Sequence, residues 1–108
     1  MKLVNKVYEQ SKLLPSDEKF GLNTQIRRSA VSIPLNIAEG CSRSSKKEFV
    51  RFLEISLGSS FELETQVLIA INGQLLDSQK AKVIIAELNE IQRMTNAYRI
   101  NVLKSIKK

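Results

Sequence analysis

The side chains that most often carry catalysis or bind metal ions are scarce in this chain of 108 residues. Histidine is absent, and Cys41 is the single cysteine. Neither a transition-metal site nor a disulfide within the chain is therefore expected. Cys41 lies in a short polar stretch and is interpreted as an inert thiol. The sequence predicts no metal and no cofactor.

Two carboxylates, Glu39 and Glu64, are the remaining candidates for acid–base chemistry, because such a pair can supply a general acid and a general base. Both fall at helical spacing among polar or apolar stripes, and Arg27 or Arg28 is the expected partner of Glu64. The alternative is a Glu64 side chain that reaches solvent past the edge of its apolar face. Glycine-rich phosphate loops and nucleophile–base pairs are absent from the sequence. We therefore expect a protein that is not an enzyme.

Polar residues recur at helical spacing between two apolar strips along the stretch from Gln25 to Gly40. This polar ladder consists of Gln25, Arg28, Ser32, Asn36 and Glu39. One strip contains Ile26, Ala30, Ile33 and Ile37, and the other contains Val31, Leu35 and Ala38. Two strips predict a helix that is enclosed on more than one side. It is interpreted either as a core helix bent at Pro34, or as a helix whose ladder also sets the register of helices or subunits.

Signals for helix ends divide the first part of the chain. A first helix is expected from about Lys2 to Leu14, and Pro15 ends it. Its expected inward side chains are Val4, Val7, Tyr8, Ser11 and Leu14. Ser16 can cap the following segment. Gly40 is expected to end the second helix in a left-handed conformation.

Two further helices follow. The run Ser45-Lys46-Lys47-Glu48 has the pattern of a capping box, which predicts a third helix that ends at Asn72-Gly73. One of its two apolar faces contains Val50, Leu53, Leu57, Phe61, Leu68 and Ile71. Asp77-Ser78 is expected to cap a fourth helix that reaches about Ile106. The seam of that helix has the 4-3-4-3-4 spacing of a bundle and contains Ile84, Leu88, Ile91, Thr95, Tyr98 and Val102.

These elements predict a single all-α domain over residues 1–108. Its expected architecture is an antiparallel up-down-up-down four-helix bundle with a short first helix. At 1.5 Å per residue the third and fourth helices each span roughly 40 Å, about twice the length of the first. One groove is then partly left without a covering helix. Either another subunit covers it or an apolar patch stays exposed.

Two sequence segments resemble a known family. QIRRSAVSIPLNIAEG, followed by EFVRFLEISLGSSFELETQ, is similar to the bacterial four-helix-bundle proteins called 23S rRNA intervening-sequence proteins. The accessory proteins of diversity-generating retroelements are also similar. The resemblance is dense from Leu14 to about Ile71. It implies a homopentamer without catalytic residues, and in the retroelement members it implies binding to a reverse transcriptase and to nucleic acid.

Basic residues are the main functional signal. The net charge of +6 favours acidic partners such as nucleic acid. In the predicted bundle the third helix begins at the end where the second and fourth helices finish. That basic end gathers Arg43, Lys46, Lys47, Arg51, Arg99, Lys104, Lys107 and Lys108. Lysines late in the fourth helix suit its dipole, but Lys46 and Lys47 at a helix start should each cost about 0.3–1 kcal/mol. We therefore expect these charges to serve phosphate binding.

Three classes of function follow, in decreasing order of support. The first is a non-catalytic, oligomeric RNA- or DNA-binding accessory or scaffold protein. The second is a structural protein–protein interaction module whose charge serves solubility, and the third is an enzyme. A membrane span is not expected, because no run of 18 apolar residues occurs. The low cysteine content fits a cytoplasmic location.

Overall fold

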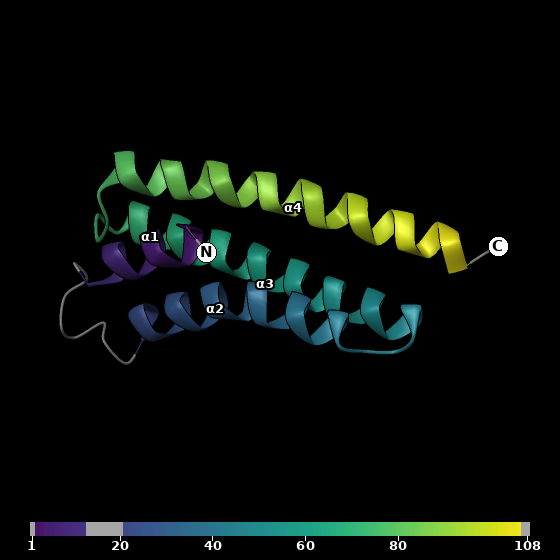
Figure 1. The fold of residues 1–108 in the computed structure, drawn as a ribbon. Coiled ribbons are helices and arrows are strands. Elements are labelled where there is room, and N and C mark those ends of the chain that lie inside the picture. The colour runs from purple at the N-terminus through teal and green to yellow at the C-terminus, as the bar shows by residue number, and fades with distance from the viewer. Residues whose placement is uncertain (1, 13–20, 107–108) are drawn as a thin grey trace.

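The protein is a bundle of four α-helices in a computed structural model that describes residues 2–12 and 21–106. The helices are α1 (Lys2–Ser11), α2 (Leu22–Cys41), α3 (Lys46–Asn72) and α4 (Ser78–Ile106). α1 lies against α2 and α4, and α3 lies against the same two helices from the other side (Figure 1). No strand occurs among the described residues. The predicted all-α class and the four-helix bundle are confirmed.

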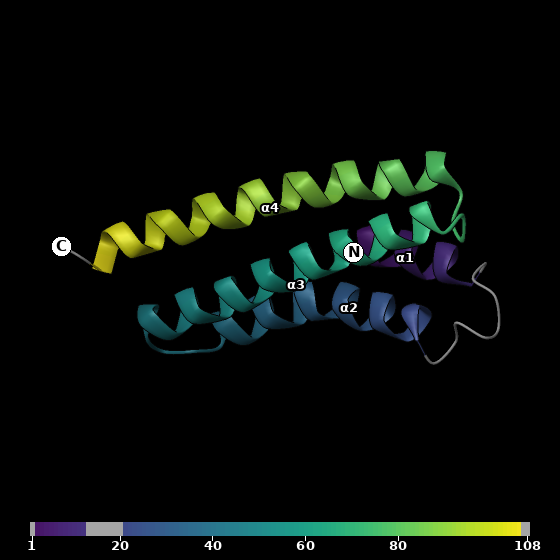
Figure 2. The same ribbon diagram turned by 180° about the vertical axis from the view of Figure 1, so that it is seen from behind.

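Consecutive helices run in opposite directions, as the colour gradient shows in both ribbon views (Figures 1 and 2). The C-terminal ends of α2 and α4 therefore lie at the end of the bundle where α3 begins. The short connection between α2 and α3 allows no other arrangement of neighbouring helices.

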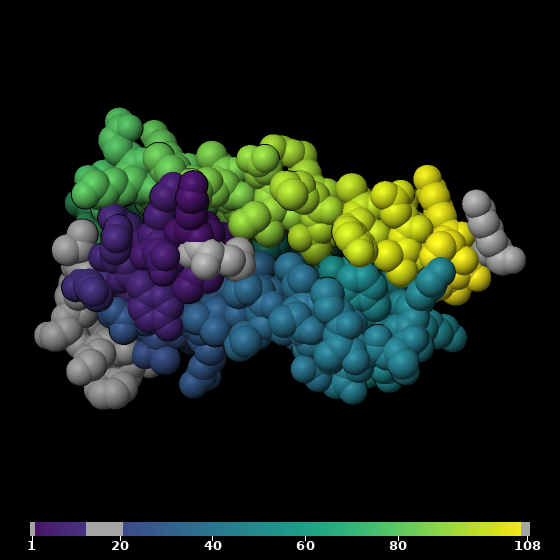
Figure 3. Space-filling model, viewed as in Figure 1, coloured from purple at the N-terminus to yellow at the C-terminus, as the bar shows by residue number. Residues whose placement is uncertain are grey.

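The hydrophobic core is concentrated in the half of the bundle that α1 covers. Its buried members come from all four helices and from the turn before α4: Leu3, Val7, Ile26, Ala30, Ile33, Leu63, Val67, Ala70, Leu76, Ala81, Ile84 and Leu88. The predicted seam of α4 is buried at Ile84, Leu88 and Thr95, whereas Tyr98 is 55% exposed. α1 lies over only one half of the molecule, as the space-filling view shows (Figure 3). The seam of α4 is therefore less buried in the half that α1 does not cover.

α1 ends at Ser11, three residues before the predicted end at Leu14, which lies outside the described residues together with Pro15 and Ser16. Two side chains of α2 bind the end of α1. The Asn23 amide donates to the carbonyl oxygen of Ser11 at 2.8 Å, and Arg27 Nε donates to Ser11 Oγ at 2.7 Å. These contacts satisfy polar groups at the helix terminus.

The prediction that Tyr8 faces inward was wrong, because Tyr8 is exposed and Leu3 is buried instead.

The predicted starts of α3 and α4 are confirmed. Ser45 Oγ accepts a hydrogen bond from the backbone N–H of Glu48 at 3.0 Å. Asp77 Oδ1 accepts from the N–H of Gln79 at 2.9 Å and, more weakly, from that of Lys80. Each cap satisfies N–H groups that have no partner within the helix.

The prediction that Gly40 ends α2 in a left-handed conformation was wrong. The helix continues to Cys41, and no described glycine has a positive φ. Close packing explains this glycine. A Cβ atom at position 40 would lie 2.8 Å from Phe49 Cδ1 and 2.9 Å from Phe52 Cβ. Gly40 therefore lets the end of α2 approach the start of α3.

None of the four helices, within the residues that the structure describes, is long and apolar enough to cross a membrane.

Candidate nucleic-acid interface

The basic end of the bundle is built where α3 and α4 converge beside the turn from α2 (Figures 1 and 2). The rings of Phe49 and Tyr98 meet edge to face with their centroids 5.4 Å apart. Arg99 Nη1 and Glu54 Oε2 form an ion pair at 3.2 Å. These two contacts join α4, at Tyr98 and Arg99, to the first turns of α3. Basic residues of both helices are thereby brought to one end.

Two of the predicted phosphate-binding residues already have partners within the chain. Arg43 forms an ion pair with Glu39, and its guanidinium lies 5.0 Å from the centre of the Phe52 ring. Arg99 is half-buried, and it donates to Asn96 Oδ1 as well as to Glu54. Both arginines therefore hold the ends of helices together.

Four other members of the basic end are exposed and make no hydrogen bond or ion pair through their side chains within the described part of the chain: Lys46, Lys47, Arg51 and Lys104. Lys46 and Lys47 open α3, where the helix dipole opposes a positive charge. Lys104 lies in the last turn of α4, where the dipole favours it. Lys107 and Lys108 lie outside the described residues.

The middle of the polar ladder binds α2 to α3. Ser32 Oγ and Ser59 Oγ share a hydrogen bond of 2.7 Å, and Asn36 Nδ2 donates at 2.8 Å both to Ser32 Oγ and to the Ser32 carbonyl. One turn away, Ser56 Oγ donates to the Ile33 carbonyl. These bonds fix the register of the two helices.

The other three ladder members lie in solvent. The side chains of Gln25, Arg28 and Glu39 are exposed, and Glu39 is paired with Arg43 rather than with a residue of α3. The ladder is thus a contact between α2 and α3 at its centre and a solvated edge at its ends.

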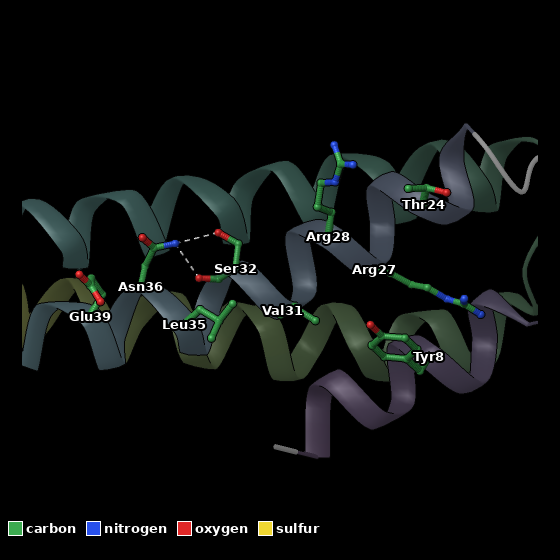
Figure 4. Close-up of a pocket in the computed structure, with 9 residues that line it drawn as sticks. All are labelled: Tyr8, Thr24, Arg27, Arg28, Val31, Ser32, Leu35, Asn36 and Glu39. Atoms are coloured by element: carbon green, nitrogen blue, oxygen red, sulfur yellow. Dashed lines mark hydrogen bonds between the residues drawn. The ribbon is translucent and has the colours of Figure 1, made fainter.

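The predicted ion pair between Glu64 and Arg27 or Arg28 was wrong. Glu64 is half-buried, and its Oε1 accepts a hydrogen bond from Gln92 Nε2 of α4 at 3.0 Å. Arg27 points away from α3, and its guanidinium lies over the Tyr8 ring of α1 at 5.0 Å (Figure 4). The error has a geometric cause: Glu64 lies on the flank of α3 that faces α4, whereas both arginines belong to α2.

A shallow groove of about 750 Å³ follows the outward face of α2 (Figure 4). Its lining combines Tyr8 of α1 with Thr24, Arg27, Arg28, Val31, Ser32, Leu35, Asn36 and Glu39. Leu35 is 61% exposed, so the second apolar strip of this helix is not covered by the chain itself. In the sequence, this surface was indicated by the second apolar strip between Gln25 and Gly40, which a helix with one buried face does not need.

No three His, Cys, Asp or Glu side chains gather among the described residues in a way that could hold a metal ion. Cys41 is exposed at the end of α2.

Comparisons with known proteins agree with the fold. The model of the family described as 23S rRNA-intervening sequence protein matches residues 1–97. A crystal structure from Bacteroides thetaiotaomicron, of a protein with unknown function from the S23 ribosomal protein family, is similar with a TM-score of 0.75. The two chains are 23% identical, and the match covers 90% of this chain and 97% of the other, which supports the fold alone. No curated protein matches the chain.

Proposed function

The chain belongs to the family of 23S rRNA-intervening sequence proteins, and from this premise we propose that it is a non-catalytic, self-associating accessory protein that binds RNA or DNA through its basic end. The binding surface is formed by the exposed cations Lys46, Lys47, Arg51 and Lys104. Contacts from lysine and arginine to phosphates position a protein on nucleic acid without reading its sequence. Little sequence preference is therefore expected.

The observation that carries this proposal is the position of Lys46 and Lys47. They occupy the first turn of α3, where each positive charge opposes the helix dipole, and neither has an acidic partner within the described residues. A stability cost of about 0.3–1 kcal/mol per lysine is offset if the charges bind phosphate. Self-association would bring several such ends together and multiply the weak contacts.

Replacing Lys46, Lys47 and Arg51 together with glutamine tests the site. The variant is expected to bind single-stranded RNA or DNA more weakly than the parent protein. The dependence of log K on log salt should also flatten by roughly 0.7 for each phosphate of a single strand that the variant no longer neutralises. Binding is measured by fluorescence anisotropy between about 50 and 200 mM salt.

A matched control removes three exposed lysines from the opposite end of the bundle: Lys12, Lys80 and Lys82. The net charge changes by the same amount, so a loss of binding through total charge alone would appear equally in both variants. Equal affinity and an equal salt slope for the parent and the Lys46, Lys47 and Arg51 variant would contradict the proposed site.

A protein–protein interaction module without a nucleic-acid role is the second candidate. It is favoured by the large apolar side chains that remain exposed, among them Leu35 at 61%, Phe61 at 52% and Met94 at 64%. In that case neither RNA nor DNA is retained at about 50 mM salt, where phosphate contacts are strong. A bacterial reverse transcriptase, which the resemblance implies as a partner, can then be tested directly for co-purification.

A further inference from the structure

A hollow between α3 and α4, here called the α3–α4 hollow, combines an exposed aromatic ring with polar side chains. The two helices lie side by side (Figures 1 and 2). The volume of the hollow is about 480 Å³. Its lining residues are Leu57 and Phe61 of α3 and Asn89, Gln92, Arg93 and Asn96 of α4. Phe61 is 52% exposed. One wall of the hollow is therefore apolar and the other is polar.

Open space adjoins the ring of Phe61. Side chains of an α-helix lean toward its N-terminus, over the residues three and four positions earlier. For Phe61 these residues are Gly58 and Leu57. Gly58 carries no side chain, and a Cβ atom at that position would meet no atom within 4 Å. Because glycine inside a helix lowers its stability, α3 keeps this space open at a cost. A flat ligand can therefore lie beside the ring.

The α4 wall offers both donors and acceptors of hydrogen bonds. Asn89 makes no side-chain hydrogen bond to any residue that the structure describes, so its amide can both donate and accept. Asn96 accepts from Arg99 through Oδ1, at 3.1 and 3.0 Å, which leaves its Nδ2 to donate. Gln92 already donates to Glu64 at 3.0 Å. The two asparagines are partly exposed, so a ligand from outside the chain can reach them.

Arg93 adds a positive charge to this wall. It is exposed, and its side chain makes no hydrogen bond or ion pair within residues 2–12 and 21–106. Glu54, seven residues before Phe61 on the same stripe of α3, does not compete for it, because Glu54 is paired with Arg99. Lys104 of the basic end lies eleven residues after Arg93, which is three helical turns and roughly 16 Å along the same stripe of α4. A line of cations thus joins the basic end to the α3–α4 hollow.

We propose that the α3–α4 hollow binds a nucleobase. The base stacks on Phe61, the amides of Asn89 and Asn96 bond to its edge, and Arg93 contacts its phosphate. A nucleobase has a flat aromatic face and an edge that carries both donors and acceptors. An inorganic anion does not need the ring, and a purely apolar ligand does not need the amides. The chemistry of the lining therefore selects a nucleobase.

Two sources can supply such a base, a single strand and a free nucleotide, because both present the same groups. A duplex is excluded as a source, since its bases are stacked on one another and cannot stack on a side chain. Where the base belongs to a strand, the inference rests on the proposed function. It then adds a contact with unpaired bases to the phosphate contacts of the basic end.

A single tryptophan can report on the stacking. The chain contains none, so Phe61→Trp introduces one fluorescent probe at the site. A base that stacks on the indole quenches its fluorescence. We expect quenching by single-stranded oligoadenylate and none by a duplex of the same length. Adenosine monophosphate, titrated separately, distinguishes the sources: quenching by the oligonucleotide alone assigns the site to strands, and quenching by the monophosphate shows that a free nucleotide also binds.

Met94→Trp is the matched control for this probe. Met94 is 64% exposed and lines a different hollow, beside Leu3 of α1. The variant carries the same fluorophore on the same protein without a change of charge. Its fluorescence should therefore stay unchanged when oligoadenylate or adenosine monophosphate is added.

Affinity measurements test the ring itself. Phe61→Ala is expected to weaken the binding of single-stranded oligoadenylate about 5-fold to 100-fold, the usual effect of losing one stacked base. Phe61→Tyr keeps a ring and is expected to bind within about twofold of the parent protein. Neither change removes a charge, so the dependence of affinity on salt should stay as it is in the parent protein. Fluorescence anisotropy gives the affinities, and circular dichroism checks that each variant is folded.

Several outcomes would overturn the inference. One is a Phe61→Trp signal that neither oligoadenylate nor adenosine monophosphate quenches, and another is equal quenching by the duplex or of Met94→Trp. A third is an unchanged affinity of Phe61→Ala for oligoadenylate; if the sedimenting mass changes instead, the ring packs against a protein. The proposed function is decided separately by the salt slope of the Lys46, Lys47 and Arg51 variant. If the parent protein binds no strand, that function fails, and adenosine monophosphate alone decides on the α3–α4 hollow.

Discussion

Ser32 is the residue at which the contact between α2 and α3 is most directly specified. Its hydroxyl bonds to Ser59 across the interface and also accepts from Asn36 in its own helix. Small side chains allow the two backbones to come close enough for this hydroxyl pair to form. A polar contact of this kind favours one register over alternatives, because a shift along the helix would leave the groups without partners.

A double-mutant cycle on Ser32→Ala and Ser59→Ala measures this contact. Each single change removes one hydroxyl and with it the hydrogen bond between the two helices, so each should destabilise the fold by about 1 kcal/mol. The double variant should lose less than the sum, with a coupling of about 0.5–1.5 kcal/mol. Urea unfolding at a fixed protein concentration gives the free energies. Ser105→Ala, at an exposed site near the end of α4, serves as the control and should stay within about 0.5 kcal/mol. Strictly additive single effects would show that the two hydroxyls do not interact.

At the scale of the helices, a few contacts at the ends determine how the elements meet. α1 is attached to α2 by Asn23 and Arg27, which bind its last residue, and to α4 by the ion pair between Lys6 and Glu87. At the other end of the bundle, α2 approaches α3 where Gly40 meets Phe49 and Phe52. The position of the basic end relative to the core therefore depends on the absence of a side chain at position 40.

Two glycines within helices allow a paired prediction at this scale. Gly40→Ala places a Cβ atom 2.8 Å from Phe49 Cδ1 and 2.9 Å from Phe52 Cβ, so α2 and α3 must separate. We expect a loss of about 1–3 kcal/mol, the usual cost of overpacking. Gly58→Ala meets no atom within 4 Å. It should stabilise α3 by about 0.5–1 kcal/mol through helix propensity. Thermal or urea unfolding measures both, and changes of the same sign would contradict the packing role of Gly40.

The whole molecule presents more apolar surface than its own four helices cover. Exposed large side chains occur on each of α2, α3 and α4, for example Leu35, Phe61 and Met94. α1 covers only one half of the groove between α2 and α4 among the described residues (Figure 3). Exposed apolar side chains that gather into a large patch mark interaction sites, so this surface supports the proposed self-association.

If copies of the chain assemble, stability should depend on protein concentration. Binding that favours the folded state raises the unfolding midpoint by mass action. We expect the melting temperature of the parent protein to rise over a hundredfold increase in concentration, measured by differential scanning fluorimetry. A constant midpoint for the parent protein would contradict assembly of the folded state.

Local signals in the sequence determined where α3 and α4 begin and that the chain forms a helical bundle. The Ser45 and Asp77 caps act within four residues, and the seam around Ile84 and Leu88 has a period that any bundle requires, so neither depends on distant parts of the chain. The same local signal at Ser45 placed the lysines in the first turn of α3, so their position could be predicted from the sequence. The pairing of Arg43 with Glu39, four residues away in one helix, could also have been inferred from the sequence.

Contacts between helices were decided only by the tertiary structure. The end of α1 at Ser11 depends on Asn23 and Arg27 of α2, and the partner of Glu64 is Gln92 because that flank of α3 faces α4. Gly40 was interpreted as a helix end because glycine favours that role locally, whereas its conformation is helical and two phenylalanine side chains explain its size. In each case the outcome depends on which neighbour a helical face meets. Periodicity gives the faces of a helix, but the rotation of each helix about its axis is set by packing among all four.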